Sequence, residues 1–223
     1  MAAGADESVL HQIRELQVKA TVEDFTPVTV KTKGIVTWAD PALGKYFQIQ
    51  DDTGGMRVEF TGPDGPKVRD LVEVNGTLER GPYAPVISAA TYSVTGTGEL
   101  PRAENASGGG LLNGEYNGLL VDIHGFVRSA EIVPPNIFVA LLSSGSARIT
   151  LRISNPGDLN PKDWIARQVF LRGVAVPVRA RSSLRQLVDV EVHGAAQADF
   201  YSRGPMPPDP WAQPVMPLHE AFQ

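Results

Sequence analysis

Neighbouring carboxylates are the first residues in this chain whose type suggests chemistry. Asp51 and Asp52 lie in the sequence QDDTGG, between two runs with the alternating pattern of strands. Successive side chains of a strand point to opposite faces, so these two carboxylates cannot form a paired acid and base. Asp, Thr and Gly are also common in tight turns, where Asp and Thr bond backbone amides. We interpret this segment as a turn at the corner of a barrel.

Histidines offer a second candidate centre. His124 and His193 lie on predicted strands, and a two-histidine metal site would need a further ligand such as Asp122 or Glu191. Structural or incidental histidines are the commoner case. The chain has no cysteine, which excludes thiol catalysis, and its serines lack the context of a nucleophile elbow. We therefore predict no catalytic residue, no metal and no cofactor, so that the chain is not an enzyme.

Aromatic and basic side chains form a third set, of the kind with which five-stranded barrels hold ligands. Tyr46 and Arg57 share the outer face of the second and third strands, and Trp38 and Tyr83 lie in the bordering loops. The same residues are also typical of packing at a barrel rim. A loop at 178–186 adds three arginines that could bind an anion or a headgroup, namely Arg179, Arg181 and Arg185. These seven residues are the predicted ligand-binding set.

The charge balance bears on the partner. A formal net charge of -5 removes the simplest case for non-specific nucleic-acid binding, which needs a basic surface. Nucleic acid is therefore not expected as a partner, and we expect an unidentified small ligand or a protein instead. No apolar run approaches the roughly 20 residues of a membrane helix, and the first residues do not form a signal peptide.

The elements that must position these residues are strands, arranged twice. Gly and Pro (22 and 18 residues) separate short runs rich in Val, Ile and Thr, which is typical of an all-β chain. Gly34 matches Gly125 at an offset of 91 positions, and Gly76 matches Gly173 at 97. The offset of 91 also sets Phe47 against Phe138, Gly54 against Gly145 and Val58 against Ile149. One insertion of six residues between the third and fourth strands of the second copy would reconcile the two offsets.

Each copy is predicted to contain five strands. They are 28–39, 45–52, 55–61, 71–80 and 85–96 in the first copy, and 119–132, 136–143, 146–154, 167–178 and 186–201 in the second. A short helix at 158–166, capped by Asp158, is expected between the third and fourth strands of the second copy, where the OB-fold has its helix. The predicted fold is therefore two tandem OB-fold-like, five-stranded Greek-key barrels.

The same pattern predicts how the chain is divided. Residues 1–27 form an amphipathic helix and lead-in, 28–98 the first barrel, 99–118 a linker with a short helix, 119–204 the second barrel and 205–223 a Pro-rich connector. A connector at the end of the chain suggests that another domain follows in a longer protein.

The sequence also resembles a repeated element of bacterial signal-transduction proteins. There, G-V-V-T is followed by F-x-x-Q-D-x-T-G-G, D-x-V-E-V-x-G and F-A-P-V-I. These motifs fall on Gly34–Thr37, Phe47–Gly55, Asp70–Gly76 and Tyr83–Ile87, with Tyr83 in place of Phe. VDIHGFVRS at 121–129, SLRQL at 183–187 and DPWAQPVMPL at 209–218 resemble the second half of the same element. The resemblance covers about residues 9–223.

In that family, tandem barrels of this kind form the extracytoplasmic input region of sensor histidine kinases and related receptors. The resemblance therefore implies a non-catalytic sensory module, periplasmic and tethered to the membrane in the full-length protein. Any kinase activity would lie in C-terminal sequence absent from this chain. The alternatives are a cytoplasmic protein and an OB-fold binder of single-stranded nucleic acid or oligosaccharide.

Overall fold

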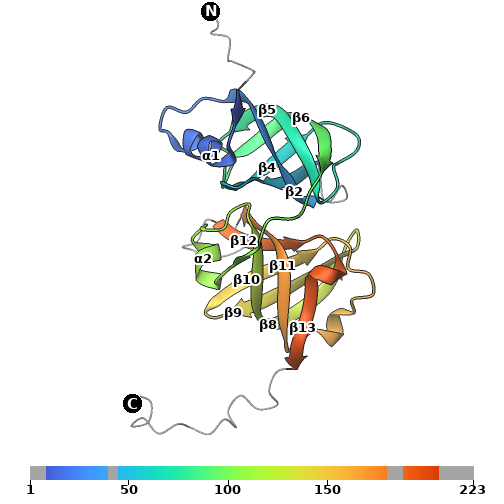
Figure 1. Ribbon diagram of the computed structural model, residues 1–223. Helices are drawn as coiled ribbons and strands as arrows, with labels where there is room; N and C mark the ends of the chain where they lie inside the picture. Colours follow the sequence, from blue (N-terminus) through green and yellow to red (C-terminus); the bar gives the residue numbers. More distant parts are fainter. Residues whose placement is uncertain (1–8, 40–44, 180–187, 206–223) are drawn as a thin grey trace, which may run out of the picture.

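A computed structural model describes residues 9–39, 45–179 and 188–205, and these form two closed β-barrels. Figure 1 shows the barrels one above the other, joined by the segment that runs from β6 to β8. The predicted fold class, two tandem OB-fold-like barrels, is confirmed. Within the described residues, no helix is both long enough and apolar enough to cross a membrane.

The first barrel is built from short alternating strands. Its elements are β1 (Leu10–His11), α1 (Ile13–Thr21), β2 (Val28–Ala39), β3 (Tyr46–Gln50), β4 (Gly55–Phe60), β5 (Asp70–Glu79) and β6 (Val86–Thr97). The sheet order is β1-β2-β3-β4-β6-β5, and pairing of β2 with β5 closes it. Alternate residues such as Met56, Val58 and Phe60 point into the core, as their spacing in the sequence predicts.

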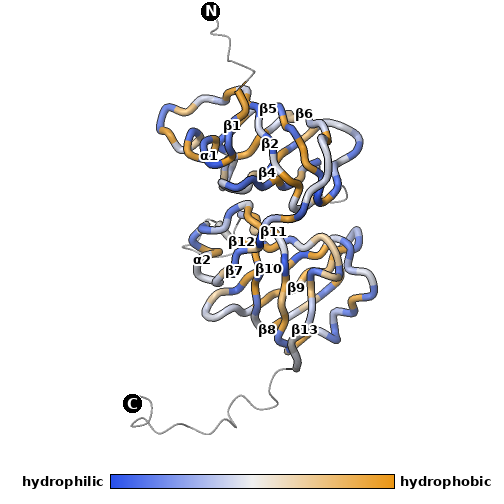
Figure 2. The backbone as a smooth tube through the Cα atoms, in the orientation of Figure 1, coloured by the Kyte–Doolittle hydropathy of each residue, from blue (hydrophilic) through white to orange (hydrophobic). Residues whose placement is uncertain are grey.

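The second barrel repeats this plan. Its elements are β7 (Glu104–Asn105), α2 (Gly108–Leu112), β8 (Leu120–Val133), β9 (Ile137–Ser144), β10 (Ala147–Ile153), the 3₁₀ turn η1 (Pro161–Asp163), β11 (Arg167–Arg179), β12 (Val188–Gly194), η2 (Gln197–Asp199) and β13 (Phe200–Pro205). Pairing of β11 with β8 closes the sheet. In Figure 2 apolar and polar stretches alternate along the strands of both barrels.

The two first-strand glycines occupy equivalent places. Gly34 pairs with Val72 and Gly125 pairs with Val169, so the offsets of 91 and 97 both hold here. Each glycine lies against the backbone of the next strand: an added Cβ would lie 2.9 Å from a carbonyl oxygen at Gly34 and 2.1 Å at Gly125. The bulge in β2 between residues 36 and 38 recurs in β8 between 127 and 129. The duplication is therefore real.

The offset of 91 is wrong for the second and third strands. Trp38 pairs with Gln48 in the first barrel, whereas Ser129 pairs with Leu141 in the second, so equivalent residues of β3 and β9 are 93 apart. The matches of Phe47 with Phe138, Gly54 with Gly145 and Val58 with Ile149 are thus two residues out of register. A shift of two preserves the face to which each side chain points, which is why the sequence pattern did not reveal it.

The repeat also extends to the segments before each barrel. β1 pairs in parallel with β2, and β7 pairs in parallel with β8 in the same manner. The helix that follows then packs into the barrel core, with Ile13, Leu16 and Ala20 of α1 buried in the first and Leu111 of α2 in the second. Each repeat is therefore a strand, a helix and a barrel.

Two predicted elements differ from those observed. The helix expected at 158–166 is only the single turn η1, capped by the side chain of Asn160 rather than Asp158. The strand expected at 186–201 is interrupted: β12 ends at Gly194, and β13 begins at Phe200 after η2. The carboxylate of Asp199 accepts hydrogen bonds from two backbone amides of the interruption, which stabilises a turn where alternation alone predicted a continuous strand.

Candidate ligand-binding site

The barrels meet at an apolar contact centred on Trp38, at the end of β2. Trp38 is fully buried and packs against Leu120, Val174 and Val176 of the second barrel. Its ring also meets His193 edge-on, with the ring centroids 5.1 Å apart. Burial of these apolar side chains holds the two barrels together.

Polar contacts fix the orientation of the barrels. The side-chain oxygen of Gln50 accepts a buried hydrogen bond of 2.9 Å from the backbone amide of Leu120. Beside it, the backbones of Gly55 and Gly118 touch, and a Cβ on Gly55 would lie 2.0 Å from the Gly118 carbonyl oxygen. Gly118 has a φ of +77°, a conformation that favours glycine. Only glycines allow this approach.

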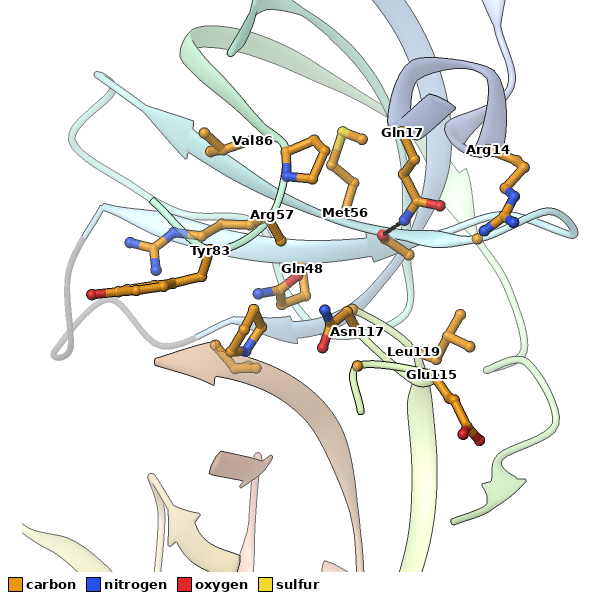
Figure 3. Close-up of a pocket in the computed structure, with 18 of the residues that line it drawn as sticks. Arg14, Gln17, Gln48, Met56, Arg57, Tyr83, Val86, Glu115, Asn117 and Leu119 are labelled. Carbon is orange, nitrogen blue, oxygen red and sulfur yellow. Dashed lines mark hydrogen bonds between the residues drawn. The ribbon is translucent and has the colours of Figure 1, made fainter. Parts of the chain in front are cut away.

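A cavity of about 510 Å³ lies between the barrels, beside this contact. Figure 3 shows it between the β3–β4 face of the first barrel and β11 of the second. Its apolar walls include Met56 and Val86 from the first barrel, Val176 and Pro177 from the second, and Leu119 from the connecting segment. Both barrels therefore contribute to one site.

Three of the polar residues that line the cavity, Gln48, Arg57 and Glu59, lie on β3 and β4. Gln48 and Arg57 are directly paired across the two strands. The Arg57 guanidinium lies 3.8 Å from the centroid of the Tyr46 ring and forms a salt bridge of 2.9 Å with Glu59. The guanidinium thus lies over the tyrosine ring, as in a cation–π contact, and is paired with a carboxylate.

Two polar atoms of this pair have no hydrogen-bond partner among the described residues. They are Oε1 of Gln48 and Nε of Arg57. The whole Gln48 residue is only 2% exposed, yet its side chain lines the cavity. A buried polar group without a partner costs about 1–3 kcal/mol, so each such atom calls for an explanation.

The structure brings some of the predicted ligand-binding residues together and buries another. Tyr46, Arg57 and Tyr83 do come together, with Arg57 and Tyr83 at one end of the cavity in Figure 3. Trp38 is a correction: it belongs to the barrel contact and its exposed fraction is 0%, so it has no surface on which a ligand could stack. The role of Tyr46, Arg57 and Tyr83 in binding stays a prediction.

The arginine loop gives no test of its prediction. Arg179 is the last residue of β11, and nothing is described of its side chain. Arg181 and Arg185 lie outside the described residues, as does the Pro-rich segment from 206 onward.

Sequence reasoning missed Gln48 and three residues that the second repeat and the helix bring to the cavity: Arg14, Glu115 and Asn117. Gln48 lies at an outward position of a predicted strand, and its partner Arg57 was singled out, so alternation alone could have indicated it. The other three depend on how the barrels pack, which no local pattern encodes.

The QDDTGG segment has the structural role expected of it, and a second one. Oδ1 of Asp51 accepts hydrogen bonds from the backbone amides of Thr53 and Gly54, which forms the turn. Its other oxygen accepts from the amide of Ile13 at 2.8 Å, and the Thr53 hydroxyl accepts from the amide of Arg14. The turn thus caps the first amides of α1, which have no partner within the helix.

The suggested histidine centre is instead a buried ion network. Glu191 accepts a hydrogen bond of 2.6 Å from Arg152 and lies 2.9 Å from Nε2 of His193, while His124 is exposed on a different strand. Burial alone would raise the pKa of Glu191, but its interactions with His193 and Arg152 outweigh this and the pKa is lowered. Asp122 forms a bidentate pair with Arg172. In the described part of the chain, no cluster of three such residues could hold a metal.

The carboxylates and histidines singled out from the sequence therefore cap turns, form ion pairs or lie on the surface. They serve the structure.

Comparison with known proteins gives no sequence family. No family model matches the chain, and no curated protein matches it. Several solved structures match its fold. The HINa domain of Ifi202 in complex with 20-bp double-stranded DNA has a TM-score of 0.37 at 10% identity, covering 82% of this chain and 100% of that one. The p202 HIN2 tetramer gives 0.35 at 13% identity, covering 84% and 100%. A replication protein A heterotrimer bound to single-stranded DNA gives 0.29 at 13% identity, covering 78% and 51%.

These structures correct one expectation. Nucleic acid was not expected as a partner, yet structures that match most of this chain include complexes with double-stranded and single-stranded DNA. Net charge, the ground for that expectation, describes the whole chain, whereas a binding site uses local groups such as Arg14 and Arg57 beside the cavity. Likenesses of this size do not identify a ligand, and nucleic acid stays among the partner classes to be tested.

Proposed function

We propose that the chain is a ligand-binding module whose ligand occupies the cavity between the two barrels. The observation that carries this proposal is the position of the cavity on the β3–β4 face, the face with which OB barrels hold oligonucleotides and oligosaccharides. Its volume of about 510 Å³ falls within the range usual for small-molecule sites. Apolar walls with a few convergent polar groups are also typical of such sites.

We infer further that binding serves a sensory role. A ligand in this cavity would contact both barrels, so its binding energy would favour one arrangement of the barrels over others. This agrees with the resemblance to extracytoplasmic input regions of bacterial signal-transduction proteins, which have membrane and signalling segments elsewhere in the protein. A fusion of the native gene to a reporter enzyme that is active only outside the cytoplasm tests the location, and an inactive reporter would favour the cytoplasmic alternative.

A cavity-filling variant tests the site. The side chain of Asn117 points into the cavity in Figure 3, so Asn117→Trp should fill the space without disturbing either core. Val94→Trp, at an exposed strand position outside the cavity, is the matched control. In a metabolite screen by thermal shift, ligands of the cavity should raise the Tm of the wild type and of the control but not of Asn117→Trp. Hits that stabilise all three proteins equally would place binding elsewhere.

Single-stranded nucleic acid is the second candidate. Arg57, Arg14 and Tyr83 line the cavity, and Arg57 lies over the ring of Tyr46 beside it, so aromatic and basic groups are combined as in single-strand binders. Anisotropy of labelled dT20 tests this. Binding that weakens as salt rises from about 20 to 200 mM, and weakens further in Tyr83→Ala, would support it. No binding at about 10 μM, or binding indifferent to salt, would remove this candidate.

A further inference from the structure

Two buried, unpaired atoms belong to Gln48 and Arg57, residues that line the cavity and that we call its floor, and they indicate the chemistry of its ligand. Oε1 of Gln48 can accept a hydrogen bond and Nε of Arg57 can donate one, and neither has a partner in the described residues. Because the two residues are directly paired on adjacent antiparallel strands, their Cβ atoms lie about 5 Å apart. A ligand could therefore engage both side chains through one edge.

The electrostatics of the floor favour a neutral ligand. Glu59 already forms a salt bridge of 2.9 Å with Arg57. The remaining charges among the residues that line the cavity are those of Arg14 and Glu115, which are opposite in sign. An anion would have to compete with Glu59 for the guanidinium and would meet the oxygen of Gln48. A cation would face the guanidinium without any unpaired carboxylate on the floor.

The walls favour a planar ligand. The planar guanidinium of Arg57, which lies over the Tyr46 ring, and the Tyr83 ring line the same end of the cavity in Figure 3. Pro177 and Val176 of the second barrel form the opposite wall. Flat surfaces of this kind suit a ring system rather than a branched chain.

We propose that the cavity takes a neutral, planar molecule with an N–H and a C=O on the same edge, the lactam arrangement of pyrimidine bases and cyclic dipeptides. The ligand N–H donates to the Gln48 carboxamide oxygen, and its carbonyl accepts from Arg57 or from the Gln48 amide nitrogen. Gln recognises a planar base edge by the same kind of paired hydrogen bonds in nucleic-acid complexes. This assignment depends on the proposed function, because it names the ligand class of the same cavity.

The test compares each lactam with its N-methylated counterpart, which keeps the ring and its carbonyls but has a methyl group in place of the N–H hydrogen. Uridine and 3-methyluridine form one pair, and cyclo(Ala-Ala) and its N,N′-dimethyl derivative form the other. Binding is measured by chemical shifts of the ¹⁵N-labelled chain, including the Gln48 side-chain amide. We expect one parent compound to bind at the cavity and its methylated form to bind at least about ten-fold more weakly, since the buried acceptor would stay unpaired. The pair that responds identifies the source of the lactam.

Two variants complete the design. Gln48→Leu removes the carboxamide at similar size and should weaken the parent compound at least about ten-fold. Ser93→Ala, at an exposed strand position outside the cavity, should leave binding within about two-fold. Equal binding of parent and methylated forms, or full binding by Gln48→Leu, overturns the lactam assignment and leaves the cavity as a binding site. If neither parent compound shifts any cavity resonance, the assignment also fails, and the Asn117→Trp screen decides separately whether the cavity binds anything.

Discussion

The two barrels share one framework but differ in what their outer faces carry. Glycines against the neighbouring strand and a bulge in the first strand recur at equivalent places. The cavity pair of the first barrel, Gln48 and Arg57, corresponds to Leu141 and Thr150 in the second, which are paired in the same way. The polar floor is therefore confined to one copy.

The second barrel carries its charges elsewhere. Arg57 pairs with Val86 in the first barrel, and the equivalent pair in the second is Thr150 with Glu191. The ion network of Glu191 thus lies where the first barrel has a valine of the cavity wall. Backbone geometry is the same in both copies, whereas side chains on the outer faces differ, so the first barrel supplies the polar pair of the cavity and the second supplies an apolar wall.

The largest expected effect concerns the glycine contact between the barrels. Gly55→Ala would place a methyl group 2.0 Å from the Gly118 carbonyl oxygen, so the barrels must shift apart, and we expect a loss of about 3 kcal/mol in the free energy of unfolding. Urea unfolding measures it. The equivalent residue of the second barrel, Arg148, is exposed, and Arg148→Ala should cost less than about 0.5 kcal/mol. Similar losses in the free energy of unfolding for the two variants would contradict this difference between the barrels.

The ion network of the second barrel should show as a pH dependence. Glu191→Gln leaves Arg152 without its carboxylate in a largely buried place, and we expect a loss of about 2 kcal/mol at pH 7. The folded-state pKa of Glu191 is lowered, so its contribution is fully present above the unfolded pKa, near 4.5, and is lost as pH falls through the folded value. The difference between variant and wild type in denaturant unfolding should therefore shrink below about pH 4.5. A difference that is constant from pH 7 to 3 would contradict this.

The cap of α1 should give a smaller effect. Asp51→Ala removes the acceptor for the amides of Ile13, Thr53 and Gly54, and we expect a loss of about 1.5 kcal/mol. The neighbouring Asp52 is exposed, so Asp52→Ala should change stability by less than about 0.5 kcal/mol. Thermal unfolding of both variants, with amide exchange of α1, separates the cap from a general effect of charge.

Most of the fold could be predicted from the sequence because it rests on local patterns. The alternation of apolar and polar residues placed nine of the ten predicted strands close to their observed bounds. The matching glycines revealed the duplication. The register of β9 and β10 could not be found in this way, since a shift of two residues leaves every side chain on the same face. The break before β13 depends on Asp199, whose turn-forming role is visible only in its hydrogen bonds.

The site was only partly predictable for a different reason. Tyr46, Arg57 and Tyr83 belong to one barrel, so the alternation of its strands was enough to group Tyr46 with Arg57, and Tyr83 was found in a loop that borders the same face. Trp38 was assigned to the ligand because nothing in its own segment shows that the second barrel covers it. Packing between repeats depends on contacts that are distant in sequence, and these decide which aromatic residue is buried and which is accessible.

The smallest expected effect has the opposite sign and tests the comparison of the barrels directly. Gln48→Leu gives the first barrel the residue that the second has at the equivalent position, Leu141. Because Oε1 of Gln48 is buried without a partner in the described structure, its removal should raise the free energy of unfolding by about 1 kcal/mol. The reverse change, Leu141→Gln, adds a polar group to a half-buried surface and should lower stability slightly. A buried polar residue that lowers the stability of the free protein is better explained by ligand binding than by packing. If the ligand-free Gln48→Leu protein is less stable than the wild type, Gln48 instead serves the packing of the barrels.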